Sequence, residues 1–349
     1  MVKLGFVDSR LRSAQDRPIG VVASLVTGFD RVAARPLLIL PPLLLDLFLW
    51  LGPKVSISPL VDQIIAQLTL PSGAEPALVE QISTVQESLQ AIAHRFNLLT
   101  ALSSLPAGVP SLMAGLLPEN TPLVWSTAVE LGDPLLILLG WLVLTGVGLG
   151  LGALYHRGLA RAAAPDMDLT SGWWAYSRLL ALGALLYGGL LIGGGIAFLV
   201  ATLAAFILPL LGIGVSFIAF SLLFWLLVYL VFTPHGIIRY RFGVMRAMME
   251  SALLVRWNFM ATVGFLGAAV VISWLTNMVW SLPATQSWYA LLAILGHSFI
   301  SGTLLTGSYA YYQGRREWMV KVRDEIEARL ENLERRRKLT PEDREEGDV

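Results

Sequence analysis

The sequence of 349 residues contains no cysteine and little charge. The absence of cysteine excludes disulfides, thiol nucleophiles, cysteine-bound zinc and iron–sulfur clusters. Charged residues make up 14% of the chain, whereas soluble domains usually have about 25%. The formal net charge is zero, which argues against nucleic-acid binding through bulk charge. Hydrophobic residues make up 55%, so the composition indicates an integral membrane protein.

Common catalytic and metal-binding motifs are also absent. There is no G-x-S-x-G, no H-E-x-x-H and no P-loop. None of the four histidines has a second histidine or a carboxylate three or four residues away, so no helical metal motif exists. We therefore expect a non-enzymatic protein without a metal or a cofactor. A pigment or haem carrier that uses His297 as an axial ligand stays open as an alternative.

Six apolar stretches are long enough to cross a bilayer, which takes about 20 helical residues. The first is short and contains Pro41, Pro42 and the carboxylate of Asp46. Only short turns separate spans 3 and 4 and spans 5 and 6, which predicts two tight hairpins. The six stretches are residues 36–52, 134–155, 178–206, 212–232, 258–280 and 288–312.

Positive charge predicts the orientation of these spans. With both termini in the cytoplasm, the cytoplasmic segments contain all of the 25 Lys and Arg residues except Lys54 and Arg95. Those two lie in residues 53–133, a segment that also contains seven acidic residues. We expect a multi-pass protein of the bacterial inner membrane, in contact with the lipid bilayer and not with nucleic acid.

The predicted fold is all-α, with three units that each consist of an amphipathic elbow and a transmembrane hairpin. The elbows cover residues 20–35, 168–177 and 235–255, and their arginines would hold anionic lipid in the headgroup plane. In the third elbow an apolar stripe is predicted, with charged residues off it. The stripe is Ile238, Phe242, Met245 and Met249, and the charged residues are Arg239, Arg246 and Glu250.

The predicted divisions are 1–35, a cytoplasmic segment; 36–313, the membrane domain with a helical insertion at 53–133; and 314–349, a cytoplasmic tail.

The insertion contains a heptad pattern typical of a coiled-coil seam. A shorter helix is predicted over 59–70, with a turn at 71–76. Two interpretations stay open: a hairpin that caps its own bundle, or a docking surface for a membrane-protein partner. Residues 105–118 are apolar but contain three prolines, which predicts an interfacial or re-entrant segment. The seam residues are Leu78, Ile82, Val85, Leu89, Ile92, Phe96 and Leu99.

After residue 314 the chain becomes highly charged, and an apolar stripe predicts that the sixth helix continues to about residue 338. This 314–338 helix is a second candidate surface for a partner. Residues 340–349 are acidic and predicted to be disordered. The stripe is Met319, Val322, Ile326, Leu330 and Leu333, and three i,i+4 ion pairs are expected: Glu317–Lys321, Glu325–Arg329 and Glu331–Arg335.

Three polar residues inside the spans form a candidate intramembrane site. Asp46, Asn277 and His297 all fall in the outer half of the predicted bundle, where ionisable groups usually face protein or water. One interpretation is hydrogen bonding to backbone groups near Pro41 and Pro42. The other is a substrate or proton site in which Asp46 and His297 face each other or a shared cavity.

Small residues also repeat within the spans, and we interpret them as helix-packing faces. The run 148–153 formally matches the dinucleotide fingerprint G-x-G-x-x-A, but it lies inside an apolar span instead of after a strand. The predicted packing residues are Gly146, Gly148, Gly150 and Gly152; Gly188, Gly189, Gly193, Gly194 and Gly195; and Ser298, Gly302 and Thr306.

Two short motifs resemble a known membrane domain. They are Ser251 followed by Arg256-Trp257-Asn258-Phe259, and Tyr311-Tyr312 followed by Arg315-Arg316-Glu317. Residues 235–317 resemble the six-helix membrane domain found beside some bacterial glycerophosphodiester phosphodiesterases and the stand-alone relatives of that domain. In that family the hydrolysis takes place in a separate soluble barrel, which this chain lacks, so the resemblance implies the fold and not the activity.

Two functions are therefore expected from the sequence. The first is a scaffold or accessory subunit of a membrane complex, because no site for chemistry is visible. The alternative is a small-solute or lipid transporter that uses Asp46 and His297.

Overall fold

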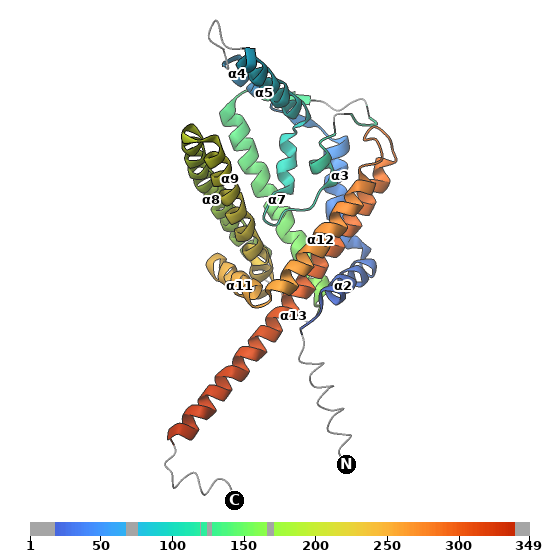
Figure 1. Cartoon of the computed structure of the whole chain (residues 1–349). Coiled ribbons are helices and arrows are strands. Elements are labelled where there is room, and N and C mark those ends of the chain that lie inside the picture. Colours follow the sequence, from blue (N-terminus) through green and yellow to red (C-terminus); the bar gives the residue numbers. More distant parts are fainter. Residues whose placement is uncertain (1–17, 68–75, 119, 124–127, 166–170, 339–349) are drawn as a thin grey trace, which may run out of the picture.

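The computed structural model describes residues 18–67, 76–118, 120–123, 128–165 and 171–338. The chain forms a helical bundle, with a small helical hairpin at one end and one long helix projecting from the other (Figure 1). The helices are α2 Val21–Ala33, α3 Leu40–Leu51, α4 Ser58–Gln67, α5 Pro76–Arg95, α6 Leu112–Leu116, α7 Pro134–Ala163, α8 Gly172–Ile207, α9 Pro209–Leu230, α10 Thr233–Tyr240, α11 Val244–Trp257, α12 Phe259–Trp280 and α13 Ala290–Lys338, with 3-10 turns η1 Pro36–Ile39 and η2 Leu98–Ser103.

Helix length and composition are typical of a multi-pass membrane protein. Among the described residues, five helices are long and apolar enough to cross a membrane. The number becomes six if α2 and the η1–α3 segment, which meet at a bend of 100°, count as one span. Side chains of α8 and α9 are largely exposed on the bundle surface, which is what a lipid-facing helix requires.

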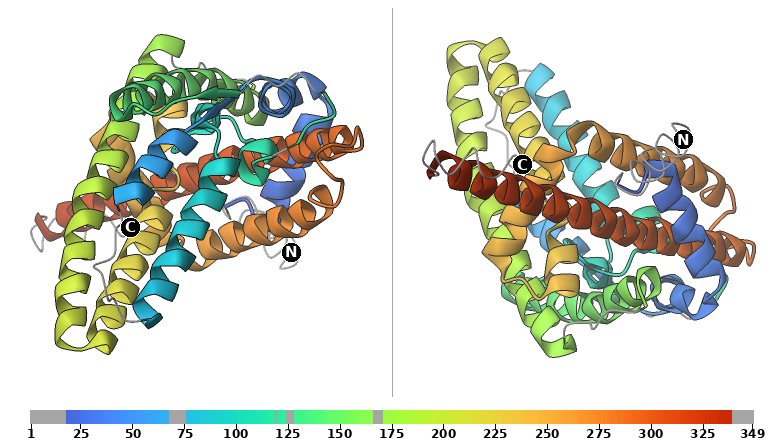
Figure 2. Two further views of the ribbon diagram at one scale, coloured as in Figure 1. Left: turned by 90° about the horizontal axis from the view of Figure 1, so that it is seen from above. Right: turned by 90° about the horizontal axis from the view of Figure 1, so that it is seen from below.

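The helix ends follow from local sequence signals. Asp133 caps α7, since its carboxylate accepts hydrogen bonds from the N–H groups of Leu135 and Leu136. Leu208 is extended and Pro209 starts the next helix, so α8 and α9 form the tight hairpin predicted from the sequence. These two helices lie side by side at the edge of the bundle (Figure 2).

The predicted elbows are found in part. The first is α2, and the third is broken into α10 and α11 because Arg241 adopts a left-handed conformation (φ 54°). The second predicted elbow, residues 168–177, is not a separate helix within the described residues. Helix α8 instead runs without a break from Gly172. The single stripe predicted across 235–255 is also wrong. Met245 and Met249 are exposed, while Arg239 is buried.

Helix α13 is the central element of the bundle. It packs against α2, α3, α7 and α12. Gly28 and Gly307 allow the α2 backbone to approach closely: a Cβ atom at Gly28 would lie 2.3 Å from the Thr303 carbonyl oxygen. At the far end, Trp50 Nε1 donates to the carbonyl of Thr285 at 2.7 Å and joins α3 to the α12–α13 turn.

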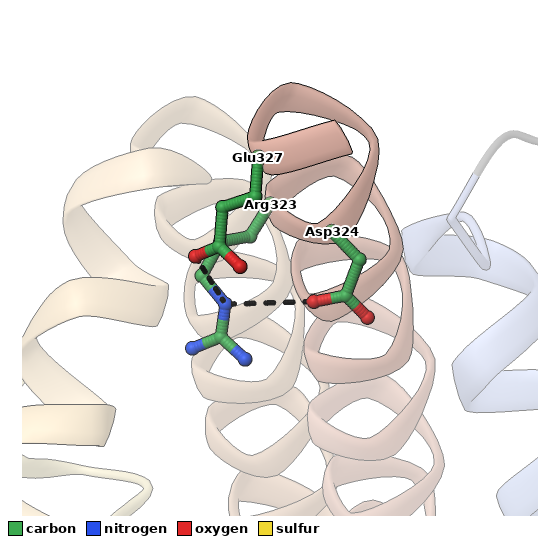
Figure 3. Close-up of polar contacts among 3 residues, drawn as sticks. All are labelled: Arg323, Asp324 and Glu327. Atoms are coloured by element: carbon green, nitrogen blue, oxygen red, sulfur yellow. Dashed lines mark ion pairs between the residues drawn. The ribbon is translucent and has the colours of Figure 1, made fainter. Parts of the chain in front are cut away.

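Beyond the bundle, α13 continues as a charged helix, as predicted (Figure 1). Figure 3 shows the guanidinium of Arg323 between the carboxylates of Asp324 and Glu327, at 3.7 and 3.9 Å. The three predicted i,i+4 pairs are wrong in detail, because none of them is an ion pair within 4.0 Å in this described helix. Exposed pairs contribute little, so the helix forms with either arrangement. Residues 340–349, predicted to be disordered, lie outside the described residues.

The insertion divides into an external hairpin and an internal segment. Helices α4 and α5 pack together at one end of the bundle, and the strands β1 (Lys54–Ser56) and β2 (Ala128–Glu130) pair in parallel beneath them. Residues 98–116 instead enter the bundle between α3 and α7, and Leu102, Val109, Leu112 and Met113 belong to the core. Of the two predictions for 105–118, packing against the bundle is therefore confirmed.

Candidate functional site

Asp46 is the most buried of the predicted polar residues, with none of its surface exposed. Its Oδ1 atom accepts hydrogen bonds from Ser111 Oγ at 2.5 Å and from the Met113 N–H at 2.9 Å. Its Oδ2 atom accepts from the Leu112 N–H at 3.2 Å. Asp46 thus binds the first turn of α6, where N–H groups have no partner within the helix.

This arrangement corrects the predicted hydrogen-bonding role of Asp46. Its partners are not backbone groups near Pro41 and Pro42, because both prolines lie in the first turn of α3. N–H groups in a first turn make no intrahelical bond, so a proline there removes none. The carboxylate instead holds the internal segment of the insertion against α3.

Asn277 and His297 are brought together by α12 and α13. His297 Nδ1 lies 3.3 Å from Asn277 Oδ1, and its Nε2 lies 3.2 Å from Ser301 Oγ. Two of the three predicted residues therefore meet. Asp46 and His297 do not pair with each other, since the hydrogen-bond partners of each side chain are other residues. Both ring nitrogens of His297 therefore have a polar neighbour within the chain.

The predicted seam on α5 divides into a covered and an uncovered row. Ile82, Leu89 and Phe96 are half-buried. Val85 and Ile92, which lie one heptad apart, are 52% and 62% exposed. The continuous helix expected over 78–99 is wrong at its end, because α5 ends at Arg95 and Leu99 lies in η2. The side chain of Leu78 and the predicted turn at 71–75 lie outside the described residues.

Two buried histidines, which the sequence did not mark as a pair, meet at α13. His156 of α7 lies with Nδ1 3.1 Å from the Tyr309 hydroxyl, and His235 of α10 lies with Nε2 2.7 Å from Ser308 Oγ. The rings of His235 and Tyr309 are 4.2 Å apart. These contacts join three helices. No local spacing could predict them, because the partners are 73 and 153 residues apart in the sequence.

Arg239, at the end of α10, is buried with 3% of its surface exposed. Its Nη2 donates to Gln313 Oε1 at 3.4 Å, while its Nε and Nη1 atoms have no hydrogen-bond partner among the described residues. Nearby, Arg316 stacks on the ring of Tyr240 at 4.1 Å and pairs with Glu250 at 3.9 Å. The amphipathic pattern placed Arg239 on a polar face, so the sequence missed its burial.

The described part of the chain contains no group of three or more His, Cys, Asp or Glu side chains that could hold a metal ion. The comparisons with known proteins found no family model, no curated protein and no solved structure that matches the chain. The resemblance of residues 235–317 to a six-helix membrane domain therefore stays a prediction.

Proposed function

We propose that this protein is a non-enzymatic accessory subunit of a bacterial inner-membrane complex, with six spans and both termini in the cytoplasm. In this arrangement η1–α3 is the first span, and α7, α8, α9, α12 and the first half of α13 are the other five. The α4–α5 hairpin then lies outside the membrane and docks an amphipathic helix of a partner protein. The charge distribution supports the orientation, because only Lys54 and Arg95 would be on the outer side.

The observation that carries this proposal is the uncovered heptad row on α5. Val85 and Ile92 are more than half exposed on a segment that, in this topology, meets water and not lipid. Ile64 of α4 adds a further aliphatic side chain that is 47% exposed. A two-helix hairpin with an open heptad row is completed by a third helix, whose apolar seam buries that row.

The hairpin is attached firmly, as a docking element requires. Lys54 Nζ donates to the carbonyl of His94 at the end of α5. The Asn97 side chain accepts from the N–H groups of Val55 and Leu99, at 3.0 and 3.1 Å. These bonds fix the base of α5 to the β1–β2 pair, which reduces the ordering cost of binding a partner.

The test introduces charge on the open row. Val85→Asp with Ile92→Asp should release a partner that copurifies in stoichiometric amount with the wild-type protein, because an aspartate would be buried in an apolar contact. The control is Ser83→Asp with Gln90→Asp, which adds the same charge on the opposite side of α5 and should keep the partner. Retention of the partner by the Val85/Ile92 variant would refute the docking surface, and a partner that proves to be a second copy would refute the accessory role.

Topology is tested separately. The chain contains no cysteine, so a single introduced cysteine is the only thiol available for labelling. Gln90→Cys, on the side of α5 away from the proposed partner, should react with a membrane-impermeant maleimide in intact spheroplasts, whereas Lys321→Cys should react only after lysis. Reporter fusions after residues 165, 245 and 330 should report cytoplasm, and one near residue 90 should report the outside. The opposite pattern would overturn the six-span arrangement.

The transporter alternative keeps one supporting observation, the Asn277–His297 contact between α12 and α13. Asp46 no longer favours it, because three donors already occupy its two oxygens. Uptake of a solute into liposomes that is lost in His297→Gln, with docking unaffected, would favour the transporter over the accessory subunit.

A further inference from the structure

The junction of α10 and α13 contains a buried cation without a counter-ion. Arg239 forms no ion pair within 4.0 Å in the part of the chain that the structure describes. Its Nε and Nη1 atoms, which carry three of the five N–H donors of a guanidinium, are buried without an acceptor. A buried charge without a partner is costly, and binding of an anion from outside the chain would offset that cost.

Neighbouring carboxylates are already engaged. Glu250 pairs with Arg316 at 3.9 Å. Glu317 accepts from Gln313 Nε2 at 2.9 Å, and Gln313 Oε1 in turn accepts from Arg239. The amide of Gln313 therefore stands between Arg239 and the closest acid on α13, and no carboxylate of the described chain touches the guanidinium.

Further hydrogen-bonding groups at the junction of α10 and α13 also have no partner among the described residues. The hydroxyl groups of Tyr240 and Tyr312 and the Nδ1 atom of His235 are buried without a partner. The rings of Tyr240 and Tyr312 lie 6.0 Å apart, and those of His235 and Tyr312 lie 5.6 Å apart. Unpaired donors at the same helix junction as an unpaired cation match an anion that has several acceptor oxygens.

From this juxtaposition we propose that Arg239, with the hydroxyl groups of Tyr240 and Tyr312, binds a phosphate group. Phosphate offers up to four oxygens, and arginine is the side chain that recognises it best. The phosphate can belong to an anionic lipid headgroup or to a small soluble molecule. The inference is independent of the partner proposed for α4–α5, because it concerns the opposite end of the bundle.

A groove opens on α13 beside Gln313, the residue that accepts a hydrogen bond from Arg239. It has a volume of about 360 Å³, and Gln313 forms part of its wall together with Ile19, Trp318 and Lys321. Glu317 also lines it, so the groove itself has one acid and one base. An anion that enters beside Gln313 can replace the amide oxygen on Arg239 while its apolar part lies against Ile19 and Trp318. This combination of a polar end and an apolar wall suits a lipid headgroup with its first methylenes.

The experiment measures thermal stability of the full chain in a neutral detergent. The probes are inorganic phosphate, phosphatidic acid and phosphatidylcholine, each compared at constant ionic strength. Phosphatidic acid, or phosphate, should raise the Tm of the wild type by about 2–5 °C. The rise should persist in Arg246→Gln, which removes an exposed arginine from the neighbouring helix α11. It should be lost in Arg239→Gln.

The sign of the effect without phosphate gives a second criterion. Because Arg239 is an unbalanced buried charge, Arg239→Gln should leave the Tm of the phosphate-free protein unchanged or raise it. A rise in Tm with inorganic phosphate indicates a soluble ligand, and a rise with phosphatidic acid alone indicates a headgroup. The proposal is overturned if no phosphate probe stabilises the wild type, if Arg239→Gln responds as the wild type does, or if Arg239→Gln loses stability equally in all buffers. Should Arg239→Gln fail to fold, Arg239→Lys keeps the charge and must still show a weakened response.

Discussion

Two buried charged side chains of this bundle have opposite environments. Asp46 is held by Ser111 Oγ and by the N–H groups of Leu112 and Met113. Arg239, equally buried, has one acceptor at 3.4 Å and two nitrogens without any. The first charge is balanced inside the chain and therefore builds the fold. The charge of Arg239 has no such partner within the described chain. A bound anion would supply the missing acceptors.

The comparison shows that burial of an ionisable residue does not by itself indicate function. From the sequence, Asp46 was the stronger candidate, because a carboxylate within an apolar span is expensive. Its cost is offset by the first turn of α6, which needs acceptors for its free N–H groups. Arg239 is the weaker candidate in the sequence, since an arginine at the end of a span is ordinary.

The largest effect is expected where the internal segment meets α7. A Cβ atom at Gly152 would lie 1.9 Å from the carbonyl oxygen of Ala107, so Gly152→Leu should lower the stability by about 3 kcal/mol or more. The matched change Gly193→Leu on α8 has no atom within 4 Å and should be neutral or slightly stabilising. Unfolding in detergent by mixed-micelle titration measures both, and equal losses would show that the segment does not press on α7.

Asp46→Asn tests the balanced charge. The amide keeps the shape but turns one acceptor into a donor that faces a backbone N–H, so a loss of about 2–3 kcal/mol is expected. Asp62→Asn on α4, where the side chain is exposed, is the control and should change the stability by less than about 0.5 kcal/mol. If both variants unfold at the same detergent composition, Asp46 does not anchor α6.

Ser111→Ala should have a smaller effect, about 1–2 kcal/mol. It removes the short bond to Asp46 and the N-cap bond to the Ala114 N–H at 3.0 Å. Since both residues belong to one network, the double variant Asp46→Asn/Ser111→Ala should lose clearly less than the sum of the single losses. Strict additivity would mean that the two side chains act independently.

The smallest effect is expected for His297→Gln. The contact with Asn277 lies on the bundle surface, and glutamine can still bond to one of the two partners, so the stability should fall by less than about 1 kcal/mol. A loss as large as that of Asp46→Asn would place His297 in the structural core of the bundle.

The small-residue pattern shows how far packing can be read from sequence. Gly148 and Gly152 do allow a close approach, but the partner is the backbone of the internal segment at Leu102 and Ala107 and not another apolar span. Ser298, Gly302 and Thr306 are buried, as expected. A Cβ atom at Gly188, Gly189, Gly193 or Gly195 would meet no other atom within 4 Å, so the prediction of a packed face on α8 is wrong within the described chain.

Composition and periodicity determined the class of the protein and most helix positions. Long apolar runs form helices wherever they are placed in a membrane, because every backbone N–H and carbonyl must be bonded within the segment. Prolines at 134 and 209 and the cap at Asp133 then set where helices begin. These signals lie within a few residues of each other, and the sequence contains them in full.

Only the tertiary structure decided which polar residues meet. Asp46 and Ser111 are 65 residues apart, and Arg239 and Gln313 are 74 apart, with no pattern in the sequence that connects them. Rotation of a helix about its axis decides whether a side chain faces protein or lipid, and an apolar span has almost no amphipathic signal to fix that rotation. The break at Arg241 turned Arg239 inward for the same reason: a change in backbone direction over a few residues reassigns every side chain that precedes or follows it.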